Sequence, residues 1–482
     1  MSQIDFDALL RLLSFTPGEP MLFNSGLFLV LFLLFSAGYA LLSAQRAKAV
    51  RLLYVTAFSY YFYYKNAGAW CCLLAVITLV NYFCALRLDH TERPAARKAW
   101  LWLAVGFMLG QLAVFKYTDF AIGTWCDLTG EPRPDTPALP VLVGISFFTF
   151  QSMNYIIDVY RRQMPATRSL TDFAFFVSFF PTLLAGPILR ARTFLPQLAK
   201  PLCVTQQMLG TGTWFIIIGL FKKCVISDYI SVNFVSRIFD NPALYSGLEN
   251  LLGIYGYALQ LYCDFSGYSD MAIGIALWMG FEIPANFRAP YKSDSITDFW
   301  RRWHISLSSW LRDYLYISLG GNRKGQLRMY FNLFLTMLLG GLWHGASWNF
   351  VIWGSVHGFA LGVHKRFREL LGHDRHYQST GIRRFFAVLL TFHLVCFCWL
   401  FFAGTSFEAS MQMIGQICSN FNPQLLPQFL EGYPLVSALM VGGFVLHFLP
   451  TAWNGKAESL AGRTPLPVQA IALALMIFLV VQ

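Results

Sequence analysis

The sequence predicts an all-α polytopic membrane protein, and three observations carry that prediction. Of its 482 residues, 56% are hydrophobic and 17% aromatic, whereas only 13% are charged, against roughly 25% in an ordinary soluble domain. Apolar stretches of about 18 or more residues, enough for a helix to cross a bilayer core of ~30 Å, recur from Leu22 to the C-terminus. Basic residues gather in alternate loops between those stretches. We expect about eleven transmembrane helices, accompanied by re-entrant or interfacial helices.

Residues 1–20 are expected to form an N-terminal interfacial segment. Its apolar positions recur at the spacing of one helix face among charged neighbours, which suits a short helix lying in the membrane interface. These positions are Phe6, Leu9, Leu10 and Leu13. The prolines and glycine at 17–20 end this helix. A frayed polar leader explains the same residues equally well, and a removable signal peptide is not expected because no basic flank and cleavage site are present.

Residues 21–482 are predicted to form a single transmembrane domain. Its catalytic core is placed at about residues 250–365. Toward the C-terminus, helices are expected near residues 383–403, 434–450 and 465–481, where apolar runs are long enough to cross the membrane.

The net charge of +11 is explained by topology and does not indicate a nucleic-acid partner. The basic groups of the N-terminal half are Arg46, Lys48 and Arg51, then residues 87–98, then Arg161, Arg162 and Arg168. The intervening loops, such as residues 119–140, carry few basic residues, and the pattern returns with a basic segment at 364–384 and none at 405–434. Because basic loops stay in the cytoplasm, we expect a periplasmic N-terminus.

The ten cysteines indicate neither a metal site nor a disulfide framework. Most lie in apolar runs, without a CxxC spacing or a histidine at ligand distance. They are best interpreted as small hydrophobic residues.

Polar groups interrupt an apolar run at residues 257–274. The groups that we expect to line an interior cavity are Asp264, Ser266, Tyr268 and Asp270. Carboxylates and hydroxyls at membrane depth must face a bundle interior or water and find hydrogen-bond partners there. A purely structural polar cluster between helices is the alternative.

The segment 284–316, which is followed by Gly320–Lys324, is too polar to span a membrane and too aromatic to lie in water. The run from Ser295 to Asp298 resembles a capping box that opens a helix, with Asp in place of the preferred Glu. We therefore predict a re-entrant or interfacial helix here.

Eight Lys or Arg residues lie between positions 288 and 328, on the side that topology makes cytoplasmic. For Arg301, Arg302 and Arg312, which lie among indoles, we favour binding of a phosphorylated ligand, since guanidinium groups suit bidentate phosphate contacts. Trp303 and Trp310 are assigned to the same site. For the basic residues that follow, at 323–328, contact with anionic lipids is the slightly favoured interpretation.

Two histidines stand out in this region. His344 lies in an otherwise uncharged stretch and His304 in the polar segment before it. One buried histidine is usually a satisfied core residue, but two beside a basic entrance favour catalysis, because burial disfavours the charged imidazole and leaves a base available. His357 is a weaker candidate. Three further histidines carry no such pattern, namely His364, His373 and His376.

At these residues the chain resembles the membrane-bound O-acyltransferase family and, within it, the bacterial alginate O-acetylation branch. The matching motifs are Met21-Leu-Phe-Asn-Ser, Tyr262-Cys-Asp-Phe-Ser-Gly-Tyr-Ser-Asp270, Phe299-Trp-Arg-Arg-Trp-His304-Ile-Ser-Leu-Ser, Trp310-Leu-Arg-Asp-Tyr-Leu-Tyr316, Gly320-Gly-Asn-Arg323 and Trp343-His344-Gly-Ala-Ser-Trp348. The similarity covers nearly the whole chain.

The resemblance implies a multi-helix fold around a central funnel in a bacterial inner membrane. The family's buried histidine falls on His344 and its companion on His304, with Asn322, Trp343 and Trp348 lining the funnel. It further implies cytoplasmic acetyl-CoA as the donor substrate, no tightly bound cofactor, and a periplasmic acetyltransferase-like partner that places acetyl groups on a polysaccharide. We expect His344 to act as general base, with His304 or an indole N–H assisting, while a covalent acyl-histidine relay remains open.

Other functions remain possible at this stage. A transporter or flippase would use the aspartates and histidines as a proton or substrate pathway, although no paired halves with broken helices are evident. Within the enzyme class, peptidoglycan O-acetylation and D-alanyl transfer are the alternatives.

Overall fold

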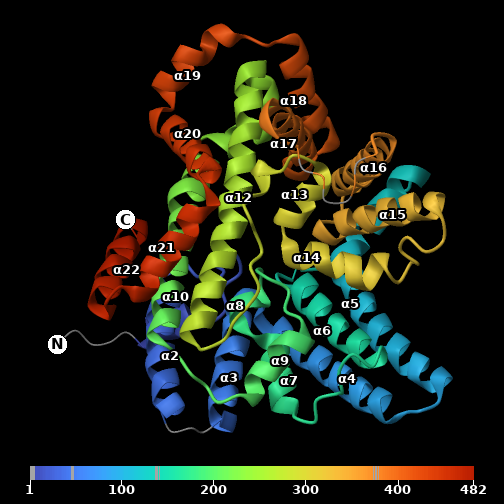
Figure 1. Ribbon diagram of the computed structural model, residues 1–482, viewed down its shortest axis with the longest axis vertical. Coiled ribbons are helices and arrows are strands. Elements are labelled where there is room, and N and C mark those ends of the chain that lie inside the picture. The colour runs from blue at the N-terminus through green and yellow to red at the C-terminus, as the bar shows by residue number, and fades with distance from the viewer. Residues whose placement is uncertain are drawn as a thin grey trace. The chain divides into compact units, whose positions relative to one another are not determined.

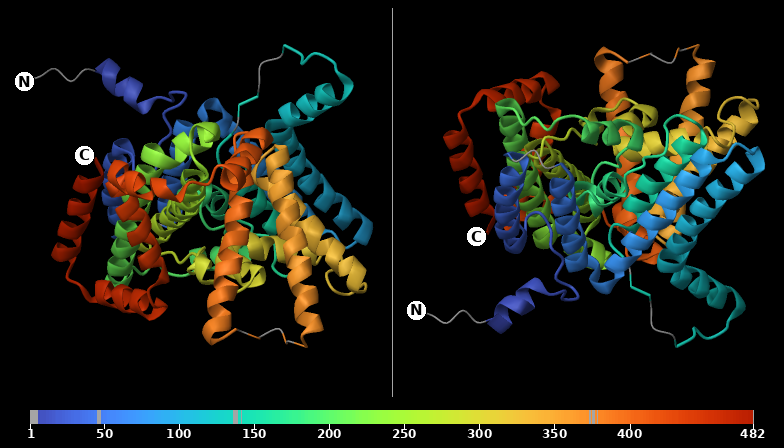
Figure 2. Two further views of the ribbon diagram at one scale, coloured as in Figure 1. Left: turned by 90° about the horizontal axis from the view of Figure 1, so that it is seen from above. Right: turned by 90° about the horizontal axis from the view of Figure 1, so that it is seen from below.

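A computed structural model describes residues 6–44, 48–135, 139, 140, 142–372, 374, 377 and 379–481 (Figures 1 and 2). Every regular element among these residues is a helix, so the all-α prediction is confirmed for the described part of the chain. Arg46, His373 and His376, together with residues 1–5, lie outside the described residues.

The described residues form two compact units. The first is built mainly from residues 1–212 and 271–284, and the second mainly from residues 213–270 and 285–480. The predicted single domain of residues 21–482 stays a prediction.

The first unit is helical throughout its described length. Its helices are α1 (Phe6–Leu13), α2 (Gly26–Ala44), α3 (Lys48–Ala67), η1 (Gly68–Trp70), α4 (Cys71–His90), α5 (Pro94–Thr129), α6 (Ile145–Tyr160), α7 (Leu170–Ser178), α8 (Phe180–Leu183) and α9 (Ala191–Ala199). Helix α5 begins at a proline and ends at Gly130 in the left-handed conformation, the usual residues for these two positions. It includes eleven residues of the loop predicted at residues 119–140, so Asp119 and Asp127 lie within the helix.

The second unit holds the remaining elements, except that residues 271–278, at the end of a long helix, belong to the first unit. Helix α10 (Gln206–Leu220) begins in the first unit and leads to η2 (Phe221–Asp228), η3 (Ser231–Val235), α11 (Ser236–Asp240), η4 (Pro242–Leu244), α12 (Gly247–Trp278), η5 (Pro290–Lys292), α13 (Ile296–Arg302), α14 (Ile305–Trp310), η6 (Leu311–Tyr316), α15 (Gln326–His344), α16 (Trp348–Leu370), α17 (Gly381–Ala403), α18 (Phe407–Ser419), η7 (Pro423–Leu425), α19 (Leu426–Gly432), α20 (Pro434–Phe448), α21 (Thr451–Arg463) and α22 (Leu466–Val481). Three of these, η2, η3 and η6, are π-helical turns.

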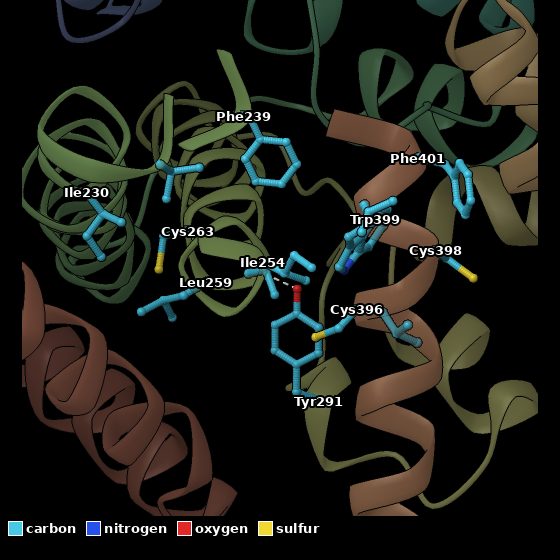
Figure 3. Close-up of a cluster of buried hydrophobic side chains, with 14 of the residues drawn as sticks. Ile230, Phe239, Ile254, Leu259, Cys263, Tyr291, Cys396, Cys398, Trp399 and Phe401 are labelled. Carbon is cyan, nitrogen blue, oxygen red and sulfur yellow. Dashed lines mark hydrogen bonds between the residues drawn. The ribbon is translucent and has the colours of Figure 1, made fainter. Parts of the chain in front are cut away.

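Aromatic and sulfur-containing side chains form the core of the second unit (Figure 3). Trp399 and Cys396 enter it from α17, while Ile254 and Leu259 enter it from α12. Tyr291 lies between these helices, and its hydroxyl donates a hydrogen bond to the backbone carbonyl of Ala258 in α12. The loop before α13 is thereby attached to the core.

Four helical stretches among the described residues are long and apolar enough to cross a membrane. They are Gly26–Ser43, Lys48–His90, Pro94–Thr129 and Gly381–Ala403. Two bent pairs raise the number to six, namely Pro423–Gly432 with Pro434–Phe448, and Thr451–Arg463 with Leu466–Val480. The chain is therefore a membrane protein with several apolar helices, and the expected number of eleven spans stays a prediction.

Candidate active site

His344 is the last residue of α15, and close packing of α15 against α16 places it. The two helices meet at glycines: a Cβ on Gly341 would lie 2.3 Å from the carbonyl oxygen of Phe350, and one on Gly354 would lie 2.5 Å from that of Met337. Such approach requires glycine on both helices. It brings Trp353 of α16 against the His344 ring, at a centroid distance of 5.1 Å.

His304 lies in a sharp break between α13 and α14. Ser295 caps α13 by accepting a hydrogen bond from the backbone N–H of Asp298 at 3.3 Å, which confirms the predicted helix start. The predicted single helix, however, ends at Arg302, because His304 has φ 43° and ψ 56°. This left-handed conformation is uncommon for a residue other than glycine.

Asn286 holds the turn that follows His304. Its side-chain oxygen accepts hydrogen bonds from the backbone N–H and the hydroxyl of Ser306, at 3.2 and 2.9 Å, and its carbonyl oxygen accepts one from Ile305 N–H at 2.9 Å. These bonds, two to the buried side-chain amide and one to the backbone carbonyl of Asn286, offset the cost of the left-handed residue. His304 is consequently fixed in the interior, with 1% of its surface exposed.

The two imidazole rings lie 6.3 Å apart between centroids. The Trp343 indole contacts both, at 5.9 Å from His304 and 4.9 Å from His344. Phe265 packs edge-on against His304 at 4.6 Å, and Phe402 against His344 at 5.2 Å. The structure thus brings the two predicted histidines together in an aromatic enclosure.

His357 lies behind this enclosure. It is fully buried and accepts a hydrogen bond from the indole N–H of Trp300 at its Nδ1, 3.3 Å away. Its ring also packs against Trp353 at 4.7 Å. His357 therefore contributes to packing, and it is connected to the ring of His344 through Trp353.

A cavity of about 510 Å³ opens beside α15. Arg301, Arg312 and Asn322 of the predicted site line it, together with Trp300. The Arg312 Nε contacts Asp313 at 2.8 Å.

Lys365 and Arg368 also line this first cavity and were not among the predicted site residues. They lie in the basic segment 364–384, whose charge the sequence analysis had attributed to topology alone. Their spacing of three residues on one helix was the signal that could have found them, since residues so spaced share a face.

A second cavity, of about 910 Å³, lies between α13, α16 and α17 and shares Thr297, Arg301 and Arg368 with the first. Arg302 lines this second cavity, and its Nε contacts the carboxylate of Asp298 at 2.8 Å. Trp303 and Trp310 are buried in the interior and line neither of the two cavities.

The polar residues of α12 pair with lysines of η2. Lys222 contacts Asp270 at 2.6 Å, and Lys223 contacts Asp264 at 2.6 Å. Nothing in the sequence analysis had singled out these lysines, although two adjacent cations after an apolar helix were visible. Ser266 is buried, Tyr268 is partly buried and Trp348 is exposed. None of these seven residues, and neither of the two histidines, lines either cavity.

Among the residues that the structure describes, no group of three or more His, Cys, Asp or Glu side chains is placed to hold a metal ion. The groups that this arrangement offers for chemistry include the two imidazoles, the indole of Trp343 and the basic side chains of the first cavity.

A sequence profile described as MBOAT, membrane-bound O-acyltransferase family, matches residues 158–403. The chain is 42% identical over 458 residues to the probable alginate O-acetylase AlgI of Pseudomonas putida, a match that covers 93% of this chain and 90% of the relative. It is 36% identical over 423 residues to the peptidoglycan O-acetyltransferase of Helicobacter pylori, covering 82% and 79%. It is 33% identical over 298 residues to the teichoic acid D-alanyltransferase of Bacillus subtilis, covering 58% and 73%.

Proposed function

The chain belongs to the membrane-bound O-acyltransferase family, and from that premise we propose that it moves acetyl groups from cytoplasmic acetyl-CoA across the inner membrane. The acetyl groups reach an extracytoplasmic polysaccharide through a periplasmic acetyltransferase-like partner. The N-terminus is periplasmic in this proposal, and the basic cavity faces the cytoplasm.

One observation supports this proposal above all, namely the pairing of His304 and His344 near a basic cavity. Helix α15 connects the two features, because Thr336 and Met337 line the first cavity and His344 ends the same helix. Trp300 also lines that cavity and packs against Trp353 at 5.7 Å. An anionic donor bound by the arginines would have its reactive end directed toward the histidines.

The proposed chemistry is a direct acyl transfer. The neutral imidazole of His344 takes the proton from the acceptor hydroxyl, whose oxygen attacks the thioester carbonyl. The C–S bond then breaks, the acetyl group stays on the acceptor oxygen, and the CoA thiolate recovers the proton from His344. His304 or the indole N–H of Trp343 stabilises the oxyanion between these steps.

The relatives favour acetyl over D-alanyl transfer. The match to an alginate O-acetylase covers 93% of this chain, and the match to a D-alanyltransferase covers 58%. We therefore propose an alginate-like exopolysaccharide as the final acceptor. Peptidoglycan is the second candidate, because a peptidoglycan O-acetyltransferase is similar over 82% of the chain.

Acetyl transfer by purified protein tests the catalytic assignment. Wild type in lipid nanodiscs, supplied with radiolabelled acetyl-CoA and an oligosaccharide acceptor, should release CoA and label the acceptor. His344→Gln should lower the rate by about 10²–10⁴-fold, the usual contribution of a positioned base. His393→Gln is the matched control, since His393 is exposed on α17. Equal rates for His344→Gln and wild type, at equal folded protein, would contradict the proposal.

The acceptor is identified in cells that lack the gene. Complementation should restore ester-linked acetate in the exopolysaccharide fraction and leave acetate in purified peptidoglycan unchanged. The opposite distribution would assign the second candidate, and ester-linked D-alanine would overturn the choice of acetyl group.

A further inference from the structure

The second cavity combines a basic end with apolar walls. Its basic lining consists of Arg301, Arg302, Arg368, Arg383 and Arg384, against Asp294 and Asp298. Arg302 is committed to Asp298 at 2.8 Å, and the carboxylate of Asp294 accepts hydrogen bonds from the backbone N–H and the hydroxyl of Ser379, at 3.1 and 2.7 Å. Both acidic groups are thus occupied within the protein.

The remaining guanidinium groups are available for an anion. Within the described ranges, no carboxylate lies at ion-pair distance from Arg301, Arg383 or Arg384. Arg383 and Arg384 are both exposed at the start of α17. Two adjacent cations with no internal partner favour a negatively charged group at this end of the cavity.

The walls away from the arginines are apolar. They are formed by Val356, Phe359, Ala360, Val363 and Phe367 from α16, and by Ala387, Leu390 and Leu394 from α17. Each set recurs at the spacing of one helix face. From Arg384 to Leu394 the apolar wall of α17 extends about 15 Å at the rise of an α-helix, a length that suits a lipid acyl chain.

The cavity is also open to the side. Three large apolar side chains of its lining are exposed, namely Phe359 at 70%, Phe367 at 58% and Leu390 at 74%. In a membrane protein, a lateral opening lined by large apolar side chains faces the hydrocarbon region.

We propose that the cavity between α16 and α17 binds an anionic glycerophospholipid. Its phosphate lies at Arg383 and Arg384, with Arg301 at the inner rim, and one acyl chain lies along the apolar walls of the two helices. A free phosphate would leave those walls uncovered, which is why we assign a lipid as the occupant. The site differs from the first cavity, although the two share Thr297, Arg301 and Arg368.

Native mass spectrometry of the full-length protein tests this site. The protein is incubated in detergent with palmitoyl-oleoyl-phosphatidylglycerol or with the zwitterionic phosphatidylcholine that carries the same acyl chains. The detergent is then removed in the mass spectrometer. We expect a saturable phosphatidylglycerol adduct that Arg383→Gln/Arg384→Gln weakens by about 30-fold, as expected for the loss of two basic contacts. Ala387→Trp, which fills the apolar part without changing charge, should weaken the same adduct.

The matched control is Arg93→Gln/Lys98→Gln. It removes the same charge from exposed residues of another basic segment that line neither cavity, and its adduct should match that of wild type. Equal weakening in both double variants would mean general attraction to a basic surface and would overturn the proposal. Equal binding of phosphatidylcholine and phosphatidylglycerol would also overturn the proposal. Displacement of the lipid by inorganic phosphate would overturn it too, because the cavity would then be a site for anions alone.

Discussion

The indole nitrogen of Trp300 donates a hydrogen bond to Nδ1 of His357 at 3.3 Å, inside the core of the second unit. Trp300 lines the first cavity, and His357 packs against Trp353, which contacts His344. The bond therefore connects the wall of the first cavity to the aromatic enclosure around the two histidines.

Removing either partner of this hydrogen bond should cost stability. His357→Leu leaves a buried indole N–H without an acceptor, and Trp300→Phe leaves the buried Nδ1 of His357 without a donor, each of which costs about 1–3 kcal/mol. The double variant should cost less than the sum of the two single changes. Thermal unfolding midpoints in one detergent measure this, and strictly additive losses would mean that the bond contributes nothing.

The left-handed backbone at His304 predicts an unusual order among three variants. His304→Gly should be more stable than His304→Ala by about 1 kcal/mol, because alanine is strained at φ 43° and glycine is not. His304→Asn should fall between them, since Asn tolerates this conformation better than Ala. Unfolding midpoints give the order.

Acetyl transfer by the same three variants separates backbone geometry from chemistry. All three should lose most activity if the imidazole itself takes part. Recovery of the wild-type rate in the glycine variant would show that only the turn matters.

The sequence predicted the start of α13 because a cap is a local signal: Ser295 and Asp298 are three residues apart. It did not predict the break at His304, since the turn is held by Asn286, which lies 20 residues before its partner Ser306 in the chain. No local pattern marks a histidine for the left-handed region.

The predicted binding site was divided by the fold for a similar reason. Arg301 and Arg312 line the first cavity, whereas Trp303 stacks on Phe299 in the core at 5.6 Å. The sequence shows that arginines and indoles alternate, but the direction in which these side chains project depends on where the helix ends. The break after Arg302 changes that direction for the side chains after it.

Charge alternation predicts the side of the membrane on which two loops lie. Alkaline phosphatase fused after Asn420, within the segment 405–434 that has no Lys or Arg, should be active because that segment is expected in the periplasm. A fusion after Leu371 should be inactive in alkaline phosphatase assays and fluorescent when the reporter is a green fluorescent protein. The reverse result would place the arginine-lined cavities on the wrong side for a cytoplasmic donor.

The contact between α15 and α16 predicts that one glycine cannot be replaced. Gly341→Ala would place a methyl group 2.3 Å from a backbone carbonyl oxygen of α16, and overpacking of this kind costs about 1–3 kcal/mol. Gly362→Ala is the control on the same pair of helices, since its Cβ would lie 3.7 Å from the nearest atom, a carbon of Tyr330. It should be neutral or stabilising by up to about 1 kcal/mol.

Unfolding midpoints compare the two glycine variants, and transfer rates report on His344, which ends the displaced helix. If both variants melt alike, the close approach of the helices is wrong.

The pair Lys222–Asp270 should be among the most costly ion pairs to break. Its side chains are 22% and 16% exposed at a separation of 2.6 Å, so Lys222→Met leaves a largely buried carboxylate without a partner, which typically costs about 3–5 kcal/mol. Adding Asp270→Asn removes the orphaned charge, so the double variant should be more stable than Lys222→Met alone.

Arg133→Gln is the matched comparison for this pair. Arg133 contacts Asp127 at 3.3 Å, but the two side chains are 67% and 69% exposed, and such surface pairs contribute about 0–1 kcal/mol. Denaturation midpoints should therefore fall strongly for Lys222→Met and hardly at all for Arg133→Gln. Similar losses in both would mean that water reaches Asp270 freely. In that case the carboxylates of α12 would lie in a hydrated pathway, as the transporter alternative requires, because hydrated carboxylates need no lysine to stay charged.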